Sequence, residues 1–349
     1  MYSIPLLNCQ GGIFMLKICI LGYGGIARTH KAGYKSELED KGIGKLVAVC
    51  DIDAARFDAK IDINLSSDDG SAKEFNTYTD LDEMLEKEQP DIVSITLPTF
   101  LHKEKAIYIM KKGFNVFCEK PMSLCYSDCL EMLAAAKECG RKLMIGQCLH
   151  FFPEYEYLKE VIADGRFGRV RSGYMSRLSG PPIWGWNNWY MDTVNSGGCL
   201  LDMHIHDVDF ARYALGEPKK VSCISKSGYS GYESAFTTLY YDDFAVTAIG
   251  DWSLKGFDFE ASFRFAFEKA TVLWKDGKLT VYPTEDKKYE VELKAQNGYG
   301  AEVAYFADVI MNGKENTKNN PESAALSIKL AETLRKSADL GGEIVPFEV

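Results

Sequence analysis

Two of the five histidines in the chain lie two residues apart, at His204 and His206. A His-x-His string by itself suggests a metal site. The neighbouring apolar residues, however, follow a helical period at Leu201, Ile205, Val208 and Leu215. On a helix, residues two apart point roughly 200° away from each other. The pattern therefore predicts one long helix, Gly198–Leu215, on which the two histidines cannot hold one ion.

Asp202 stands four residues before His206, so the two side chains share a face of this helix, and Asp209 extends that face. A carboxylate beside an imidazole fixes its tautomer and raises its basicity, which is what a proton-transfer pair requires. The alternative is a capping or salt-bridged His–Asp pair with a structural role. Residue type and spacing alone leave both interpretations open.

A lysine that could do chemistry ends a strand-like run, in the string Cys118-Glu119-Lys120-Pro121. In open α/β sheets, ligands bind outside the carboxyl ends of the strands. An ammonium group at this place, followed by a proline that shapes the turn, is suited to pointing into that crevice. A solvated surface lysine is the commoner interpretation when the residue type is taken alone.

A glycine-rich string, Gly22-Tyr23-Gly24-Gly25-Ile26-Ala27, follows an apolar run and opens a helical pattern, as a dinucleotide-binding fingerprint requires. Gly22 allows the tight turn, Gly24 lets the backbone approach a pyrophosphate, and Ala27 keeps helix and strand close. The phosphates would lie at the helix N-terminus. Asp51, at the end of the next apolar run, is placed to bind the ribose hydroxyls of NAD. The alternative is a glycine turn in an unrelated α/β protein.

The elements that must position these motifs change character along the chain. Up to about Gly146, short apolar runs alternate with helical patterns, which indicates a parallel sheet with helices on both faces. The expected strands are 16–21, 45–50, 91–96, 115–118 and 143–146, and the expected helices are 26–40, 80–88, 102–112 and 128–139. From about Val170, strand-like runs follow one another with only turns between them, at 221–227, 235–241, 244–251, 261–267, 270–275, 278–282 and 288–293. These runs predict an antiparallel meander, which the helices 301–311 and 321–340 follow.

Length and composition limit the classes of function. The chain has 349 residues, which predicts two domains at roughly 100–200 residues per domain. Its 50 acidic and 40 basic residues give a net charge of −10, which argues against binding to nucleic acid or to an anionic membrane surface. No apolar run approaches the roughly 18 residues that a membrane span needs. The ten cysteines show no C-x-x-C or zinc-finger spacing, so we expect packed thiols in a reducing cytoplasm and no metal.

These observations divide the chain into four parts. Residues 1–14 lack the basic start of a signal peptide, so we expect an extension before the fold. We expect a NAD-binding Rossmann domain over 15–146 and a substrate-binding and oligomerisation domain over 147–320. A C-terminal helix and tail then occupy 321–349.

Three strings occur in an order that resembles one known family: Gly22-x-Gly24-x-x-Ala27, Glu119-Lys120-Pro121, and Gly197-Gly198 followed by Asp202-x-x-x-His206. The family is that of glucose–fructose oxidoreductase and inositol dehydrogenase (Gfo/Idh/MocA), and the resemblance runs from about Met15 to the C-terminus. It implies an α/β Rossmann domain followed by an α+β domain with a large, mostly antiparallel open sheet. It also implies an NAD-dependent oxidoreductase acting on a secondary alcohol of a sugar, sugar derivative or cyclitol.

The resemblance also implies roles for individual residues. The family's catalytic lysine falls on Lys120, and its aspartate and histidine fall on Asp202 and His206. The implied cofactor-binding residues are Gly22, Tyr23, Gly24, Gly25, Ile26, Asp51, Thr96, Pro98, Thr99, His102, Glu119 and Lys120. The implied substrate-binding residues are Lys120, His150, Arg177, Trp184, Trp189, Asp202 and His206. Many relatives carry arginine in place of His150, and the two tryptophans either stack on a sugar ring or pack in a core or interface.

Two other classes of function remain open at this point. One is a non-catalytic regulator that binds a dinucleotide and a sugar, although such a binder needs no proton-transfer pair. The other is a redox-neutral or metal-assisted glycoside-processing enzyme that keeps its cofactor, with Asp202, His206 and Asp209 as metal ligands. In either case the predicted sheet has few helices to cover it, so we expect a homodimer or homotetramer joined through its free face.

Overall fold

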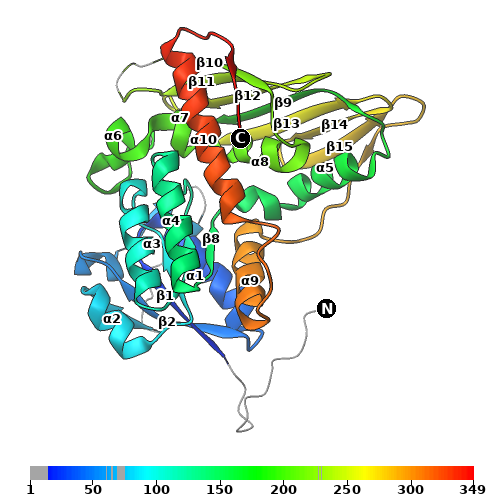
Figure 1. Cartoon of the computed structure of the whole chain (residues 1–349). Helices are drawn as coiled ribbons and strands as arrows, with labels where there is room; N and C mark the ends of the chain where they lie inside the picture. The colour runs from blue at the N-terminus through cyan, green and yellow to red at the C-terminus, as the bar shows by residue number, and fades with distance from the viewer. Residues whose placement is uncertain (1–14, 60, 64–65, 69–74, 227, 229) are drawn as a thin grey trace.

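The computed structural model describes residues 15–59, 61–63, 66–68, 75–226, 228 and 230–349, so the predicted extension 1–14 lies outside the described residues. Two sheets with their covering helices form two layered halves, and the long C-terminal helix runs along both of them (Figure 1). The observed architecture confirms the predicted fold class, a parallel Rossmann sheet followed by a mostly antiparallel sheet with helices.

The first half is a parallel sheet of six strands in the order β5-β2-β1-β6-β7-β8. Its strands are β1 (Leu16–Leu21), β2 (Gly44–Cys50), β5 (Asn76–Tyr78), β6 (Ile92–Ile95), β7 (Asn115–Cys118) and β8 (Leu143–Ile145). The predicted runs became strands because their residues are apolar on both faces, as burial between two helix layers requires. The short edge strand β5 and the hairpin of β3 (Ile61–Ile63) with β4 (Ser66–Asp68) were not predicted.

Helices cover both faces of this sheet. They are α1 (Gly25–Tyr34), which continues into a π-helical turn (Lys35–Glu39), α2 (Leu81–Glu88), α3 (His102–Lys111) and α4 (Tyr126–Cys139). A further helix, α9 (Gly298–Met311), returns from the far end of the chain and buries Val303 and Phe306 in the same core as Ile18. The predicted boundary at residue 146 therefore places α9 in a different part of the chain from the sheet that it covers.

The second half is a sheet of nine strands in the order β16-β15-β14-β13-β9-β12-β11-β10-β17. Its strands are β9 (Val170–Leu178), β10 (Lys220–Lys226), β11 (Ser234–Tyr240), β12 (Ala245–Asp251), β13 (Glu260–Phe267), β14 (Ala270–Lys275), β15 (Lys278–Pro283), β16 (Tyr289–Glu290) and β17 (Val345–Pro346). Each of the seven predicted runs contains a strand, although in the run 288–293 only Tyr289–Glu290 is strand. The uninterrupted meander was wrong, because β9 inserts between β12 and β13 and runs parallel to β12.

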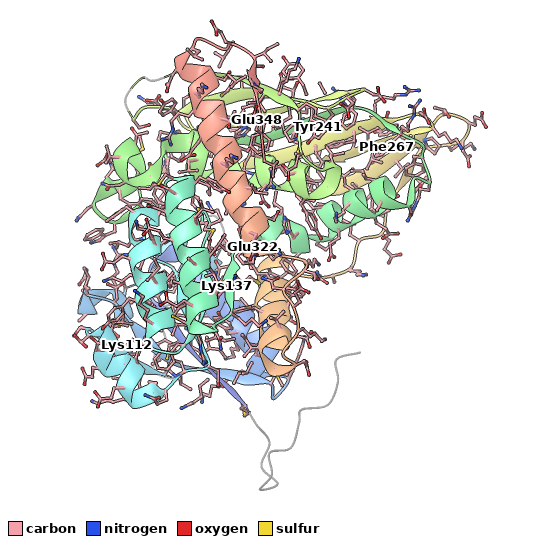
Figure 2. All side chains as sticks on the ribbon, in the orientation of Figure 1. Lys112, Lys137, Tyr241, Phe267, Glu322 and Glu348 are labelled. Carbon is pink, nitrogen blue, oxygen red and sulfur yellow. The ribbon has the colours of Figure 1, made fainter. Side chains whose placement is uncertain are left out.

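One face of this sheet carries helices α5 (Pro153–Asp164), α8 (Ile205–Leu215) and α10 (Pro321–Asp339) (Figure 1). Helix α10 joins the two halves: Glu332 accepts a hydrogen bond from the Tyr126 backbone N–H at the start of α4, at 2.9 Å. Ser327, on the same helix, accepts one from Arg212 of α8 at 2.6 Å. Figure 2 shows the side chains of α10 above those of α4, with Glu322 near its first turn and Lys137 below it.

The predicted helix 198–215 is broken into α7 (Gly198–Asp202) and α8, so the prediction of one continuous helix was wrong. The break lies at Met203 and His204, whose backbone N–H groups both donate to the Cys199 carbonyl, at 3.1 and 2.9 Å. The His204 ring is fully buried against the second sheet, where its Nε2 lies 3.0 Å from Thr237 Oγ1. A Cβ on Gly250 would lie 2.8 Å from His204, so only glycine leaves room for this ring.

Candidate active site

Asp202 and His206 remain on one side of the chain despite the break. From Gly198 to Arg212 every residue is buried except these two, which are partly exposed. The short turn after α7 therefore directs two polar side chains to one accessible surface, while the residues around them hold the turn in the core. This surface lies between the two halves of the molecule, because Asp202 contacts a residue of the Rossmann half.

That residue is Lys120, which lies two residues after the end of β7. Its Nζ donates a hydrogen bond to the Asp202 carbonyl oxygen at 2.8 Å and lies 3.5 Å from Asp202 Oδ1. The peptide bond between Lys120 and Pro121 is cis. The lysine and aspartate side chains are 16% and 13% exposed, so the ion pair has limited access to water. The structure thus brings together Lys120 and Asp202, which are far apart in sequence, at the carboxyl edge of the parallel sheet.

Burial and charge set the ionisation of the two helix-break residues. Burial raises the pKa of Asp202, and the nearby Lys120 ammonium opposes that rise. Burial lowers the pKa of His206 well below 6.5, and the positive charges of Lys120 and Arg177 lower it further. His206 is therefore a neutral imidazole at neutral pH, which is the form that accepts a proton.

The predicted hydrogen bond between Asp202 and His206 is not among the contacts of the described residues. His206 Nδ1 instead lies 3.8 Å from the Sγ of Cys148, in the 3₁₀ turn η4 (Cys148–Phe151). Burial raises the pKa of the Cys148 thiol well above its usual range, so it is protonated. Sequence reasoning missed Cys148, because a lone cysteine after a strand carries no signal that would separate it from a packed thiol.

Tyr190 is a second residue that the sequence did not single out. Burial, together with the nearby Asp202 and Glu119 carboxylates, raises the pKa of its phenol well above the usual range. Trp189 stacks on its ring at 4.0 Å between centroids, and Trp184 makes an edge contact at 4.9 Å. The two predicted tryptophans therefore both contact Tyr190, which lies near Asp202. Trp184 is 59% exposed. The aromatic composition of this loop was the available signal.

The glycine loop between β1 and α1 has the geometry that a dinucleotide needs. Gly22 has φ +91°, and a Cβ there would lie 2.7 Å from Leu97. At Gly24, the N-cap of α1, a Cβ would meet nothing within 4 Å, so the approach to the helix N-terminus is open. Asp51 Oδ2 accepts the Tyr23 N–H at 2.7 Å, and its Oδ1 accepts the Asp53 N–H at 2.9 Å. The carboxylate is thus fixed beside the loop, as ribose recognition requires.

The other predicted cofactor-side residues brace the neighbouring loops. Thr96 is buried and donates its hydroxyl to the Gly22 carbonyl. His102 is buried with its ring nitrogens 2.8 Å from the carbonyl oxygens of Pro121 and Leu97, and burial lowers its pKa. It thereby links the loop after β6 to the loop that carries Lys120. Thr99 is buried in the first of these loops.

Two predicted substrate-binding residues are already engaged by other side chains. His150 is buried, with its Nε2 2.7 Å from Asp209 Oδ2 and its ring stacked on Tyr213 at 3.7 Å. Arg177 is buried and forms a salt bridge with Asp207 at 3.1 Å. The positive charge of Arg177 nevertheless lowers the pKa of His206.

The third member of the predicted helix face does not join the other two. Asp209 accepts a hydrogen bond from Ser327 Oγ at 2.6 Å with one oxygen and contacts His150 with the other. It therefore faces α10, away from the accessible surface of Asp202 and His206. The prediction that Asp209 extends their face was wrong, because Asp209 is buried and both of its carboxylate oxygens are held by residues outside that face. A metal site built from Asp202, His206 and Asp209 is not assembled.

His204 offers a control for the catalytic interpretation. We expect His204→Ala to reduce turnover far less than His206→Ala, because the His204 ring contacts Thr237 in the second sheet. We expect it instead to lower the free energy of unfolding by on the order of 1–3 kcal/mol, because a buried hydrogen bond and packed volume are lost. Steady-state rates and urea denaturation measure the two effects. Equal losses of turnover for the two variants would contradict this assignment.

A parallel sheet with a glycine loop and a fixed Asp51, followed by a mostly antiparallel sheet that brings Asp202 to Lys120, defines a dinucleotide-binding fold with a second sheet at its carboxyl edge. The chain belongs to the GFO/IDH/MocA family. Residues 16–147 match the family's N-terminal domain, described as "Oxidoreductase family, NAD-binding Rossmann fold". Residues 155–273 match the "GFO/IDH/MocA C-terminal domain". These matches confirm the family that the sequence motifs indicated.

Individual relatives differ in activity. The chain is 36% identical to 2,7-anhydro-N-acetylneuraminate hydratase of Escherichia coli over 151 residues, which cover 41% of this chain and 39% of the hydratase. It is 27% identical to scyllo-inositol 2-dehydrogenase (NADP(+)) of Bacillus subtilis over 286 residues, covering 75% and 82% of the two chains. The chain thus spans about two fifths of the length of the hydratase and of two other curated relatives that it matches at 36% identity.

Solved structures share the fold over nearly the whole chain. An aldose-aldose oxidoreductase from Caulobacter crescentus, complexed with glycerol, superposes with a TM-score of 0.81 at 21% identity, covering 95% of this chain and 100% of the other. In the described part of the chain, no helix combines the length and apolar character needed to cross a bilayer.

Proposed function

We propose that this protein is an NAD-dependent dehydrogenase that acts on a secondary alcohol of a sugar, sugar derivative or cyclitol. The observation that carries the proposal is the convergence of Lys120, Asp202 and His206 on one accessible surface at the carboxyl edge of the sheet whose glycine loop precedes α1. A binding module has no need of a neutral imidazole beside a desolvated ammonium group.

The residues present fit a nicotinamide dinucleotide. The N-terminus of α1 is open at Gly24, where it would hold the pyrophosphate. Asp51 would accept hydrogen bonds from the ribose hydroxyls. A bound nicotinamide would supply the acceptor for the hydride that leaves the alcohol carbon. All other steps belong to side chains of this chain.

Proton transfer is assigned to His206. The neutral imidazole takes the hydroxyl proton through Nε2, which requires that Nδ1 carry the ring hydrogen. In this assignment the Cys148 sulfur, 3.8 Å from Nδ1, is the acceptor of that hydrogen. Lys120 donates a hydrogen bond to the substrate oxygen and stabilises the negative charge that develops there. Asp202 holds the Lys120 ammonium and binds a neighbouring hydroxyl of the substrate.

A panel of cyclitols, hexoses and glycosides with NAD⁺ and NADP⁺ tests the proposal. Stoichiometric formation of reduced nicotinamide, lost in Lys120→Ala, supports a dehydrogenase. The 36% sequence identity to a hydratase favours a second candidate function, a redox-neutral reaction in which the cofactor is reduced and oxidised again within one turnover. Conversion of a substrate without accumulation of reduced nicotinamide would support that candidate. If no compound is converted and none changes the absorbance, the enzyme proposal is contradicted.

We also propose that two or four copies associate through the outer face of the second sheet. Ile224 and Phe236, which are neighbours across β10 and β11, are 55% and 45% exposed on that face. Exposed apolar side chains in register on a sheet mark an interface. We expect light scattering to give a multiple of 39.1 kDa, and Phe236→Glu to shift the mass towards the monomer. Leu130→Glu, at an exposed apolar residue of α4 in the Rossmann half, is the matched control, and a 39.1 kDa species for the unmutated chain would contradict the proposal.

A further inference from the structure

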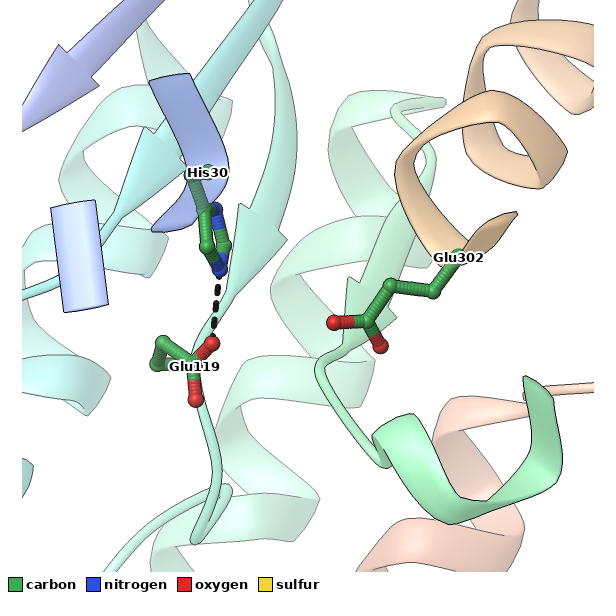
Figure 3. A group of neighbouring side chains, drawn as sticks. All are labelled: His30, Glu119 and Glu302. Carbon is green, nitrogen blue, oxygen red and sulfur yellow. Dashed lines mark hydrogen bonds and ion pairs between the residues drawn. The ribbon is translucent and has the colours of Figure 1, made fainter. Parts of the chain in front are cut away.

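Three buried side chains from three elements meet beneath the Lys120 loop: His30 of α1, Glu119 after β7, and Glu302 of α9 (Figure 3). One ligand atom of each lies within 4.8 Å of the others. His30 and Glu302 have no exposed surface, and Glu119 is 6% exposed. None of the reaction steps above uses this cluster, although Glu119 is adjacent to Lys120 in the chain.

A chain of hydrogen bonds leads from Tyr34 through Ser94 and His30 to Glu119. The Tyr34 hydroxyl donates to Ser94 Oγ at 3.0 Å, and Ser94 Oγ lies 2.9 Å from His30 Nδ1. The serine hydrogen is thus free to point to Nδ1, which leaves the ring hydrogen on Nε2. That nitrogen lies 2.7 Å from Glu119 Oε1, while the backbone N–H of Lys120 donates to Glu119 Oε2 at 3.1 Å. Both oxygens of Glu119 therefore accept an N–H hydrogen bond, and one of them holds the Lys120 backbone.

Glu302, unlike Glu119, accepts no hydrogen bond in the described structure, since neither of its carboxyl oxygens has a partner there. Among the described residues, no lysine or arginine forms an ion pair with Glu302 or Glu119. Two buried carboxyl groups this close are both ionised only if a cation lies between them, and otherwise one of the two keeps its proton. Burial and the Glu119 charge raise the pKa of Glu302 well above 4.5, so the proton belongs to Glu302.

A cation is the less favoured partner. The direct contact of 2.7 Å between His30 Nε2 and Glu119 Oε1 occupies the two atoms that would have to separate to ligate one metal ion. A carboxylic acid needs only a rotation of the Glu302 carboxyl group, or one bridging water, to donate to Glu119. The other titratable groups that face Glu302 are the phenols of Tyr34 and Tyr299 and the thiol of Cys148, whose raised pKa values keep them neutral.

We propose that Glu302 is a protonated positioning residue whose carboxyl O–H is shared with Glu119, so that α9 holds the Glu119–Lys120 segment in place. The role at Lys120 rests on the proposed function, whereas the shared proton does not. Loss of the proton would place two like charges under the loop and displace the Lys120 backbone, because Glu119 is its hydrogen-bond acceptor. Glu302→Gln keeps a hydrogen-bond donor for Glu119 without the titratable proton, whereas Glu302→Ala removes that donor.

Infrared difference spectra between the unmutated protein and Glu302→Gln test the proton directly. We expect the C=O stretch of a protonated carboxyl group in the unmutated protein at neutral pH and its absence in the variant. Glu315→Gln, at an exposed glutamate, is the matched control and should leave the band unchanged. Absence of the band from the unmutated protein overturns the shared proton. So does a stoichiometric metal ion that the purified protein holds and Glu302→Gln loses.

Thermal unfolding gives a second readout that is independent of activity. A carboxyl group whose pKa is raised by folding stabilises the folded state below its unfolded pKa of about 4.5, and that stabilisation is lost as the pH rises towards the folded pKa. We therefore expect the Tm of the unmutated protein to fall more than that of Glu302→Gln between about pH 5 and pH 8, by at least about 2 °C. Equal pH slopes for the two proteins would overturn the assignment.

Kinetics then test the positioning role. Once a substrate is known, we expect Glu302→Ala to lower kcat by on the order of 10-fold with a smaller change in KM, and Glu302→Gln to retain most of kcat. Equal losses in the two variants would overturn the role at Lys120. If Lys120→Ala kept normal turnover while the infrared band and the Tm slopes were as expected, the proposed function would fail and the shared proton would stand.

Discussion

His206→Ala is expected to lower turnover by on the order of 10²-fold or more, the usual contribution of one acid–base group. The neutral imidazole is the base in the proposed oxidation, and the other four histidines of the chain are buried, with His204 in contact with Thr237. Affinity for NAD, measured by fluorescence titration, should barely change. Near-normal turnover of the variant at neutral pH would contradict the assignment.

The pH profile distinguishes loss of a base from general damage. Since burial and the charge of Lys120 lower the pKa of His206, the acid limb of kcat/KM for alcohol oxidation is expected below pH 6.5. Activity then falls only when the medium is acidic enough to protonate the imidazole. Lys120→Ala removes one of the charges that lowers this pKa, so the limb should move to higher pH in the residual activity. A limb above 6.5 in the unmutated protein would contradict this account.

Lys120→Ala and Asp202→Asn are expected to lose turnover on the same scale as His206→Ala. Lys120 carries the ammonium that stabilises the reacting oxygen, and Asp202 holds that ammonium at 3.5 Å. Because the three groups act on one oxygen and one proton, the double variants should lose less than the product of the single losses. Full additivity would indicate that the three side chains do not act on the same step.

The second large effect concerns the choice of cofactor. We expect the unmutated protein to prefer NAD over NADP in kcat/KM by on the order of 10–10²-fold or more. A hydrogen bond to a charged group is worth about 1.5–3 kcal/mol, and 1.4 kcal/mol is a factor of about ten. Asp51 is fixed by two backbone N–H groups, so its negative charge faces the ribose and opposes a 2′-phosphate. Ile52, the next residue, is 81% exposed and offers the phosphate no cation.

Arg56 is the residue that opposes this expectation, because its guanidinium could pair with a phosphate one turn further on. One relative is named as an NADP(+) enzyme, so membership of the family does not decide the preference. We expect Asp51→Ser to narrow the gap by weakening NAD and relieving the repulsion of NADP, and Arg56→Ala to leave the NAD parameters unchanged. Equal kcat/KM for the two cofactors in the unmutated protein would contradict the role of Asp51.

Much of the fold could be predicted because its signals are local. The runs 16–21 and 115–118 are apolar on both faces, and they became β1 and β7 with the same bounds. The strand β9 was missed because its exposed arginine and glycine residues give no alternating pattern, and it is stabilised by pairing with β12 and β13. The break between α7 and α8 was missed for a similar reason. Every residue there has helical propensity, and the turn depends on the burial of His204 under Gly250.

The family, the glycine loop, Asp51 and the candidate residues Lys120, Asp202 and His206 could be predicted from sequence alone, since each lies in a short string whose chemistry depends on neighbours in the chain. The side chains that these residues contact are visible only in the folded molecule. Lys120 pairs with Asp202, His206 meets Cys148, and Glu119 lies between His30 and Glu302. These contacts join residues up to hundreds of positions apart, and their hydrogen bonds and pKa shifts depend on burial and on distances of a few ångströms. Local spacing contains neither quantity, because both arise when the two sheets and α9 pack together.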